Sequence, residues 1–208
     1  MKILIVAATL PEIAGLHQHF ELQPAPLVQT TNFDTLVTGV GMTATAFALG
    51  RQLTTNYNLV LNIGIAGCFD TTYPLGTVLH ITADEFSELG AEDKDSFIPI
   101  ETLGFGKSKY TSDYATPAVS SLPKVHGITV NTVHGNKQQI EAIEKRLQPV
   151  TESMEGAAVF YACEQAGIPC LQVRSISNYV EERNKANWNI GLALKNLNEW
   201  AIDYLTNA

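Results

Sequence analysis

The sequence is poor in cysteine and in basic residues, and each shortage excludes a class of protein. Its three cysteines, Cys68, Cys163 and Cys170, show no C-x-x-C spacing and stand in apolar contexts, as expected of reduced core thiols in a cytoplasmic protein. Thirteen Lys and Arg residues against 21 Asp and Glu residues give a formal net charge of −8. Binding to nucleic acid or to an anionic membrane surface needs clustered cations, so neither partner is expected.

Long hydrophobic runs are also missing, and none approaches the ~18–20 apolar residues of a membrane span. The opening apolar run over residues 2–8 is too short for a signal sequence and predicts a strand. Hydrophobic residues make up 45% of the chain and charged residues 16%, as in ordinary globular proteins. Strand-like and helix-like segments alternate to the end without a repeat or a linker, which predicts one α/β domain over residues 1–208.

Periodicity and turn residues place the elements along the chain. The predicted strands cover residues 2–8, 33–38, 59–63, 76–82, 125–133 and 170–173. One predicted helix ends near residue 20, and the other predicted helices cover residues 43–53, 137–147, 155–166 and 187–205. Small residues from Gly64 to Gly67 predict a tight turn after the third strand, where backbone N–H groups can approach a ligand closely. Residues 83–124 have a weak pattern and predict a long loop.

The stretch from Thr151 to Asn178 organises the rest of the chain. Its alanine-rich first half predicts a helix that begins at Glu155 and stops at Gly167, which accepts the left-handed C-cap conformation. The β-prone run that follows predicts a short buried strand, and Asn178 stands where that strand ends. Ligands of open α/β sheets bind outside the carboxyl ends of the strands. Glu155 and Asn178 are therefore candidates to hold a ligand there.

Each candidate residue also has a purely structural interpretation. Glu12 stands three residues after Thr9, the spacing of a helix capping box. Glu155 suits the positive end of its own helix, and an Asn after a strand is commonly a turn residue. The Gly64–Gly67 turn lacks the full spacing of a dinucleotide or phosphate-binding fingerprint. The five histidines show no pair at metal-ligand spacing, so no metal site is expected.

Several segments taken together are far more specific than these single residues. MKILIVAATLPE, VLNIGIAGC, ESMEGAA and VRSISN, in this order and spacing, resemble the purine nucleoside phosphorylase and nucleosidase superfamily, especially its hydrolytic branch near the methylthioadenosine/S-adenosylhomocysteine nucleosidases. FIPIETLGF, TESMEGAAVFYAC and RSISNYVEERNKANWNI are similar to the futalosine hydrolases of the menaquinone pathway. This resemblance, over nearly the whole chain, implies a twisted mixed central sheet flanked by helices. It also implies a homo-oligomer, dimer or larger, whose neighbouring subunits help to close the site, and no cofactor.

The resemblance implies roles for individual residues. Glu12 matches the acid that activates the attacking water, a task worth typically ~10²–10⁴-fold in rate. Met154 and Glu155 match a pair under the ribose, where a fixed negative charge stabilises the cationic transition state. Arg174 matches an arginine of its strand and is interpreted as structural. The segment beside the nucleoside is matched by Ile65, Ala66 and Gly67.

Asn178 departs from the adenine-specific nucleosidases, which carry an aspartate there to protonate the departing base. An amide donates hydrogen bonds but delivers no proton at neutral pH. A 6-oxopurine offers acceptors at N7 and O6, whereas adenine presents a donor at its amino group. Asn178 therefore favours hypoxanthine as the base, although an amide flipped to present its oxygen would weaken the preference.

One hypothesis and several alternatives follow. The hypothesis is hydrolysis of futalosine, a small-molecule nucleoside, to hypoxanthine and dehypoxanthine futalosine. The alternatives are an adenine nucleosidase of the methylthioadenosine/S-adenosylhomocysteine type, a phosphorylase, and a non-catalytic nucleoside-binding domain. A phosphorylase needs cations around its phosphate, but residues 8–15 contain no Lys or Arg and Ile65 has no hydroxyl. The candidates for binding the distal carboxylate of futalosine are Lys107, Lys109 and Arg183.

Overall fold

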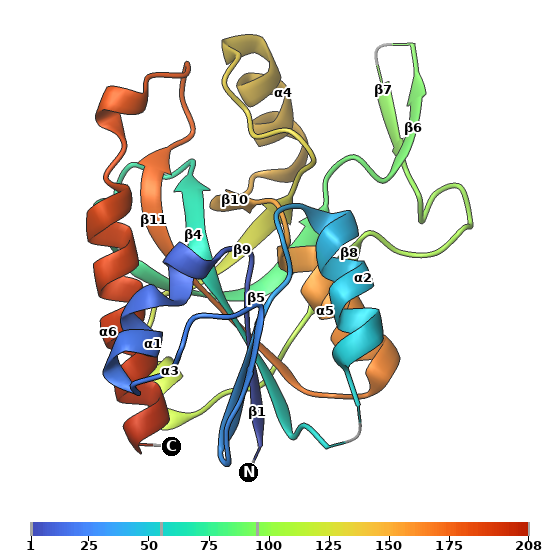
Figure 1. Cartoon of the computed structure of the whole chain (residues 1–208). Coiled ribbons are helices and arrows are strands. Elements are labelled where there is room, and N and C mark those ends of the chain that lie inside the picture. The colour runs from blue at the N-terminus through green and yellow to red at the C-terminus, as the bar shows by residue number, and fades with distance from the viewer. Residues whose placement is uncertain (1, 55, 95, 208) are drawn as a thin grey trace.

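A mixed sheet of nine strands forms the centre of the molecule (Figure 1). The computed structural model describes residues 2–54, 56–94 and 96–207. The strands run in the order β10-β9-β5-β11-β4-β1-β3-β2, and β8 pairs with β5. Their bounds are β1 Ile3–Ala7, β2 Leu27–Gln29, β3 Phe33–Val37, β4 Leu59–Cys68, β5 Val78–Phe86, β8 Lys109–Thr111, β9 Lys124–Thr129, β10 Thr151–Ser153 and β11 Cys170–Tyr179. A separate hairpin of β6 (Gly90–Asp93) and β7 (Ser96–Pro99) projects from the body.

Helices cover both faces of the sheet (Figure 1). One face carries α1 (Ala14–His19) and α6 (Ile190–Asn207), and the other carries α2 (Met42–Gln52) and α5 (Gly156–Ala166). The remaining helical segments are α3 Pro117–Ser120, α4 Lys137–Leu147 and the 3-10 turns Leu10–Ile13 and Lys185–Asn187. The twisted mixed sheet flanked by helices that the sequence predicts is thus confirmed.

The apolar run of β1 is buried from both sides. Ile3, Ile5 and Ala7 belong to a hydrophobic cluster with α1 and α6, whereas Leu4 and Val6 belong to a cluster with α2 and α5. Successive side chains of a strand point to opposite faces of its sheet. A strand covered on both faces therefore has apolar residues at every position, and this pattern predicts a central strand here.

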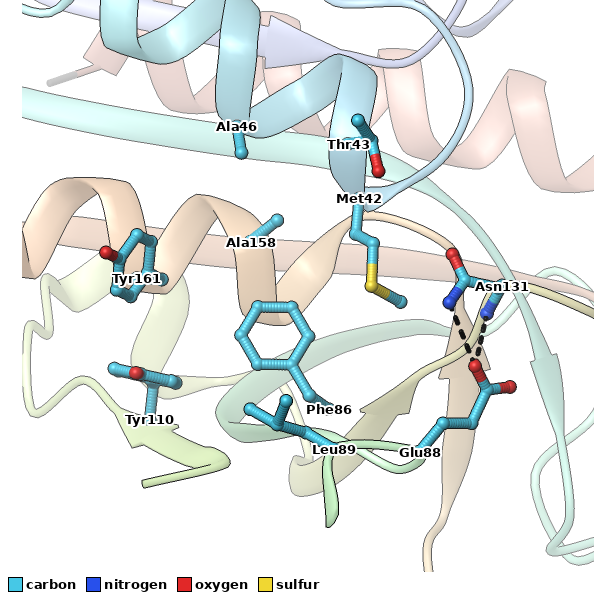
Figure 2. Close-up of a pocket in the computed structure, with 10 residues that line it drawn as sticks. All are labelled: Met42, Thr43, Ala46, Phe86, Glu88, Leu89, Tyr110, Asn131, Ala158 and Tyr161. Carbon is cyan, nitrogen blue, oxygen red and sulfur yellow. Dashed lines mark hydrogen bonds between the residues drawn. The ribbon is translucent and has the colours of Figure 1, made fainter. Parts of the chain in front are cut away.

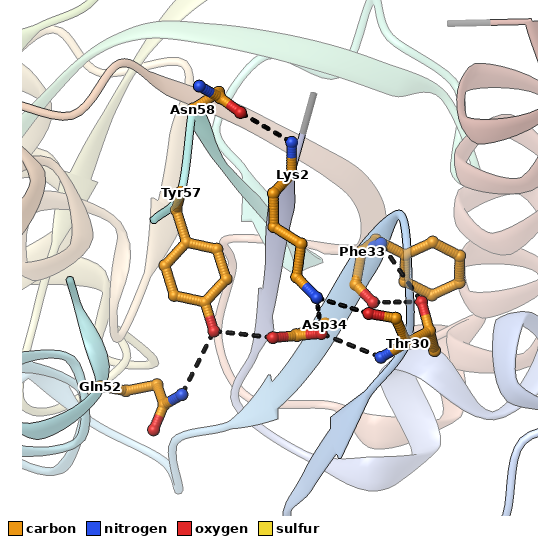
Figure 3. Close-up of polar contacts among 7 residues, drawn as sticks. All are labelled: Lys2, Thr30, Phe33, Asp34, Gln52, Tyr57 and Asn58. Carbon is orange, nitrogen blue, oxygen red and sulfur yellow. Dashed lines mark hydrogen bonds and ion pairs between the residues drawn. The ribbon is translucent and has the colours of Figure 1, made fainter. Parts of the chain in front are cut away.

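A polar cluster holds together β1, β3 and the segment before β4, towards the amino ends of these strands (Figure 3). The buried carboxylate of Asp34 pairs with Lys2 Nζ at 2.8 Å. It also accepts hydrogen bonds from the Tyr57 hydroxyl at 2.8 Å and the Thr30 N–H at 2.9 Å. Burial by itself raises the pKa of a carboxyl group, but the hydrogen bonds from Lys2, Tyr57 and Thr30 outweigh burial and hold the pKa of Asp34 below its ordinary value. The satisfied partners indicate a structural role.

The predicted turn from Gly64 to Gly67 is wrong, because β4 continues through it to Cys68. These residues pair with Arg174–Asn178 of β11, and Gly67 also pairs with Glu152 of β10. Pairing with the neighbouring strands continues through these residues, so the chain does not turn here. β11 likewise runs to Tyr179, and its Asn178 lies inside the strand rather than beyond its end.

The long loop predicted for residues 83–124 is only partly present. This segment contains the end of β5, the β6–β7 hairpin, β8 and α3. Pairings of three or four residues offer too few alternating positions to be recognised in a sequence. The three-residue strands β2 and β10 escape prediction for the same reason. The last helix begins at Ile190 rather than at residue 187, because residues 185–187 form a 3-10 turn.

Candidate active site

A cavity of about 300 Å³ opens at the carboxyl ends of β1, β4 and β11. Ligands of open α/β sheets bind at this end of the strands. Among the segments that meet here, four bring together the catalytic and substrate-binding residues predicted from the sequence. These lining residues are Glu12, Ile65, Ala66, Gly67, Met154, Glu155 and Asn178.

Glu12 is only 6% exposed, and its carboxylate accepts several hydrogen bonds. Oε2 accepts from the N–H and the hydroxyl of Thr9, at 2.8 and 2.9 Å, and Oε1 accepts from the Ile65 N–H at 3.2 Å. Burial raises the pKa of Glu12 and the charge of Glu155 adds to the rise, whereas Arg174 and these hydrogen bonds oppose it. A higher pKa makes the carboxylate a stronger base near neutral pH. Glu12 thus supports the capping turn and also faces the cavity.

Asn198 on α6 fixes the segment that carries Glu12, and no motif in the sequence indicates it. Its Nδ2 donates to the carbonyls of Glu12 and Leu194, at 3.0 and 2.7 Å, and its Oδ1 accepts from the Leu16 N–H at 2.8 Å. A Cβ at Gly15 would lie 2.9 Å from the Cβ of Asn198. The close approach of α6 to α1 therefore requires a glycine at this position.

Glu155 precedes the first residue of α5, but its side chain does not cap that helix. Instead, its Oε1 accepts a hydrogen bond from the Gly41 N–H, 3.0 Å away at the start of α2. Gly41 has a φ of +96°, a backbone conformation that favours glycine. The carboxylate therefore joins the two helices that cover this face of the sheet. It is 7% exposed and lines the cavity.

A buried polar network fixes the N-terminus of α5. Asp84 on β5 accepts hydrogen bonds from Thr129 Oγ1 at 2.8 Å and from Gln172 Nε2 at 2.7 Å. Thr129 Oγ1 in turn accepts from a backbone N–H in the first turn of α5, at 2.7 Å. A Cβ at Gly156 would lie 2.0 Å from Asp84 Oδ2, so only glycine allows this approach. Burial raises the pKa of Asp84 to about 6.

Asn178 pairs with Gly67 just after a register shift in the β4–β11 ladder. Such a bulge changes the direction of a side chain. Oδ1 of Asn178 accepts a hydrogen bond from the Ser177 hydroxyl at 2.8 Å, and Nδ2 donates to the Tyr179 carbonyl at 3.0 Å. An amide nitrogen carries two hydrogens. One N–H of Asn178 is therefore left for a ligand. Its oxygen faces the Ser177 hydroxyl, whose single hydrogen is also within reach of the Ala66 carbonyl at 3.2 Å.

Apolar side chains complete the cavity. Those of Val40, Val133, Trp188, Ile190 and Leu194 line it. They come mainly from loops and from the start of α6, where no periodic pattern distinguishes a ligand contact from an ordinary apolar residue. Only the complete fold identifies this wall.

The cations proposed for the distal carboxylate lie in different places. The guanidinium of Arg183 is 5.2 Å from the ring centre of Trp188, which lines the cavity. Lys107 instead pairs with Glu164 on α5 at 2.7 Å, and Lys109 lies on β8. Of the three, Arg183 therefore has the contact that connects it to the cavity.

A larger cavity of about 500 Å³ lies between α2, α5 and the end of β5 (Figure 2). Its lining is mainly apolar and includes Met42, Phe86 and Tyr161. Glu88 is the only acid in the lining, and it accepts a hydrogen bond from the side-chain amide of Asn131 at 2.9 Å. The smaller cavity is therefore the better candidate for hydrolytic chemistry, because three acids, Glu12, Glu152 and Glu155, line it beside an amide donor.

Within the described residues, no group of three or more His, Cys, Asp or Glu side chains is arranged to hold a metal ion. The helices described for this chain include none long and apolar enough to cross a membrane. Cys68, Cys163 and Cys170 are buried free thiols, as predicted.

Comparison with known proteins identifies relatives of the chain. A family model described as the phosphorylase superfamily matches residues 2–204. The futalosine hydrolase of Streptomyces coelicolor is 33% identical over 150 residues, which cover 69% of this chain but only 63% of that protein's length. The futalosine hydrolase of Acidothermus cellulolyticus is 33% identical over 216 residues, which cover 95% of this chain and 87% of that protein.

A solved structure shows the same fold. The 5′-methylthioadenosine/S-adenosylhomocysteine nucleosidase of Helicobacter pylori matches with a TM-score of 0.83 at 16% identity, over 100% of this chain and 99% of that one. At so low an identity, the match establishes the fold alone. The family model and the Acidothermus relative establish more. The chain belongs to the phosphorylase superfamily and, within it, to the futalosine hydrolase family.

Proposed function

We propose that this chain hydrolyses the N-glycosidic bond of futalosine and releases hypoxanthine and dehypoxanthine futalosine. Similarity to two proteins named futalosine hydrolase supports the proposal. The observation that carries it is the Asn178 amide, whose nitrogen donates to the Tyr179 carbonyl and keeps a second N–H for a ligand while its oxygen faces the Ser177 hydroxyl. That donor suits N7 and O6 of a 6-oxopurine, whereas the amino group of adenine would present a second donor to it.

In the proposed reaction, Glu12 is the general base. Water attacks the anomeric carbon, its hydroxyl forms the new C–O bond, and its proton passes to the Glu12 carboxylate. The electron pair of the breaking C–N bond leaves with the purine, which takes up a proton from solvent water to become neutral hypoxanthine, and Glu12 then returns its proton to solvent. The raised pKa of Glu12 brings its basicity closer to neutral pH, where a general base is most effective.

Glu155 and Asn178 stabilise the two charges that develop as the bond breaks. One oxygen of Glu155 is held by the Gly41 N–H, and the other is left to accept hydrogen bonds from ribose hydroxyls and to oppose the positive charge on the ribose. The free N–H of Asn178 donates to the purine as negative charge accumulates on it. Water and the nucleoside are sufficient for this chemistry, so no cofactor is needed.

The test is a time course of base release from futalosine, inosine, methylthioadenosine and S-adenosylhomocysteine, each with and without phosphate. We expect hypoxanthine from futalosine at a rate that phosphate does not change, because the described residues that line the cavity include no Lys or Arg. A strict phosphate requirement with ribose 1-phosphate as product would identify a phosphorylase. Release of adenine alone would identify an adenine nucleosidase, and binding without release would identify a nucleoside-binding domain.

We also propose that the enzyme acts as a homo-oligomer in the cytoplasm. Val40 lines the cavity yet is 56% exposed, and Phe47 on α2 is 65% exposed. A second subunit on this side would cover both side chains and close the cavity. Buried free thiols suit a reducing compartment. Light scattering after size-exclusion chromatography should give the wild-type protein a mass of at least twice that of one chain. Phe47→Asp should give a smaller mass. A monomeric wild-type protein would contradict the proposed homo-oligomer.

A further inference from the structure

The helix that begins after Glu155 takes its N-terminal caps from neighbouring strands. The first N–H groups of a helix have no partner within the helix, and the side chain of the preceding residue ordinarily accepts from one of them. Glu155 stands in that position before α5, but its side chain makes no such bond. The Gly156 N–H instead donates to Ser153 Oγ at 3.3 Å. The Ala157 N–H donates to Thr129 Oγ1 at 2.7 Å. The Glu155 carboxylate is therefore released from the capping role.

A chain of buried side chains fixes the Thr129 hydroxyl as an acceptor for α5. Asn62 Nδ2 donates to Gln172 Oε1 at 2.9 Å. The other end of that amide, Nε2, therefore faces Asp84 and donates to its Oδ2 at 2.7 Å. Oδ1 of Asp84 is left for the single hydrogen of the Thr129 hydroxyl, 2.8 Å away. With its hydrogen directed there, the hydroxyl turns its lone pairs to the Ala157 N–H.

The carboxylate that these caps release is directed at the cavity. Glu155 lines the cavity, and its Oε1 accepts from the Gly41 N–H at 3.0 Å. Without the Thr129 hydroxyl, the Ala157 N–H would be buried with no acceptor. The side chain of Glu155 is the one placed to replace it, because a residue before a helix reaches the N–H two or three positions on. Glu155 would then turn from the cavity towards its own helix.

We propose that Thr129, held by Asp84, is the positioning residue that keeps Glu155 directed at the ribose, and that it thereby sets the preference for a nucleoside with a 2′-hydroxyl. The inference rests on the proposed function, in which Glu155 accepts hydrogen bonds from ribose hydroxyls, and extends it to the residues beneath α5. A purely structural Thr129 would stabilise the start of α5 and would be indifferent to the 2′-hydroxyl.

The experiment measures binding of futalosine and of its 2′-deoxy counterpart by calorimetry, in a Glu12→Gln background that slows turnover. Thr129→Val replaces the hydroxyl by a methyl group of similar shape. The preference for futalosine should shrink by roughly 10–100-fold, the scale of one hydrogen bond to a charged group. Thr129→Ser keeps the hydroxyl and should keep the preference. Thr35→Val removes another buried hydroxyl, which lies on β3 at 2.9 Å from His17 Nε2, and is the matched control that should leave the preference unchanged.

Several outcomes would overturn the inference. One is an unchanged preference in a folded Thr129→Val. Another is a folded Thr129→Ser that loses the preference although its hydroxyl is present, and this smaller change decides the question if Thr129→Val fails to fold. Equal binding of both nucleosides by the Glu12→Gln parent is a third. The proposed function fails separately: wild-type protein that leaves futalosine intact, while the parent shows a preference that depends on Thr129, would refute the hydrolysis and not the role of Thr129.

Discussion

The guanidinium of Arg174 occupies the space that a side chain at Gly64 would fill. A Cβ at Gly64 would lie 2.1 Å from Arg174 Nη1 and 2.8 Å from Glu12 Oε1. The glycine therefore lets a buried cation approach the proposed general base across β4. Arg174 is 1% exposed, and its charge lowers the pKa of Glu12 against the larger effect of burial. The sequence predicts only a structural arginine here, and the structure adds an electrostatic role.

Replacing Arg174 by Met should move the acidic limb of the pH profile of kcat/KM to higher pH. Removal of a nearby positive charge raises the pKa of a carboxyl group, so Glu12 would ionise only at higher pH. The limb is measured with futalosine from pH 4 to 8. Arg174→Lys keeps the charge and is the matched control. A limb that stays at the wild-type pH in a folded Arg174→Met would show that this charge does not influence the base.

Glu12→Gln should lower kcat by ~10²-fold or more, the scale of a general base, and leave ligand binding nearly intact. Glu12 also accepts hydrogen bonds from Thr9, but loss of a cap of this kind lowers stability by only about 1 kcal/mol. The free energy of unfolding therefore reports the capping role of Glu12, and kcat reports its role as general base. Urea unfolding measures the first quantity, and steady-state turnover measures the second. A variant that unfolds easily but turns over normally would leave Glu12 with the structural role alone.

The predictable part of the fold is the part with strong local patterns. The double-sided burial of β1 and the amphipathic helix α4, predicted with its observed bounds, follow from periodicity in neighbouring residues. The extension of β4 through Gly64–Gly67 does not, because it depends on pairing with β11 and β10, which are distant in the sequence. Small residues signal a turn in the sequence, whereas in the sheet Gly64 makes room for Arg174.

The residues of the candidate site likewise divide into those that sequence motifs predict and those that depend on tertiary contacts. Every residue predicted through the family motifs lines one cavity. Asn198, Thr129 and Trp188 were not predicted, because each acts through a contact across the fold rather than through a local motif. Asn198 reaches Glu12 over 186 positions of sequence, a separation at which spacing carries no information. Their identification requires the tertiary structure.

Asp84 should make the folded state more stable at mildly acidic pH. Its pKa is about 6 in the folded chain, against roughly 4 in an unfolded one. Between these values the folded chain holds a proton that the unfolded chain has lost. The stabilisation is therefore fully present below about pH 4 and is lost as the pH rises through about 6. Its size is at most about 3 kcal/mol.

Asp84→Asn removes this titration and should flatten the corresponding part of the stability curve. The measurement is urea unfolding of both proteins between pH 4 and 7.5, with the difference between them plotted against pH. Other titrating groups cancel in that difference, because they are common to both chains. Parallel curves would show that Asp84 titrates alike in the folded and unfolded states.

Arg183→Ala should raise KM for futalosine by roughly 10-fold, because the guanidinium lies against Trp188 at the cavity and can bind the distal carboxylate of the substrate. Inosine lacks that carboxylate, so its KM should stay the same. Lys107→Ala is the control, since Lys107 pairs with Glu164. Steady-state kinetics with both substrates give the comparison. Equal effects on futalosine and inosine would mean that Arg183 supports the cavity wall rather than the carboxylate.

Asn178→Asp should shift the base preference from 6-oxopurines towards 6-aminopurines. Ser177 would still donate to one oxygen of the new carboxyl group, as it does to Asn178 Oδ1, but the other oxygen would face the Tyr179 carbonyl that now accepts from Nδ2. A protonated carboxyl group has one hydrogen, which can turn from that carbonyl to N7 of adenine when the substrate binds, and the group can also accept from the amino group. Futalosine should lose activity, because a buried acceptor without a donor costs about 1–3 kcal/mol.

The quantity to measure is kcat/KM for futalosine and for its 6-amino counterpart, in wild type and in Asn178→Asp. The ratio of the two preferences is insensitive to general damage, since a loosened fold lowers both rates together. We expect it to fall by at least ~10-fold, the scale of one unmatched hydrogen bond. If the ratio stayed the same within error, Asn178 would not read the base. Base selection would then have to reside elsewhere in the cavity wall.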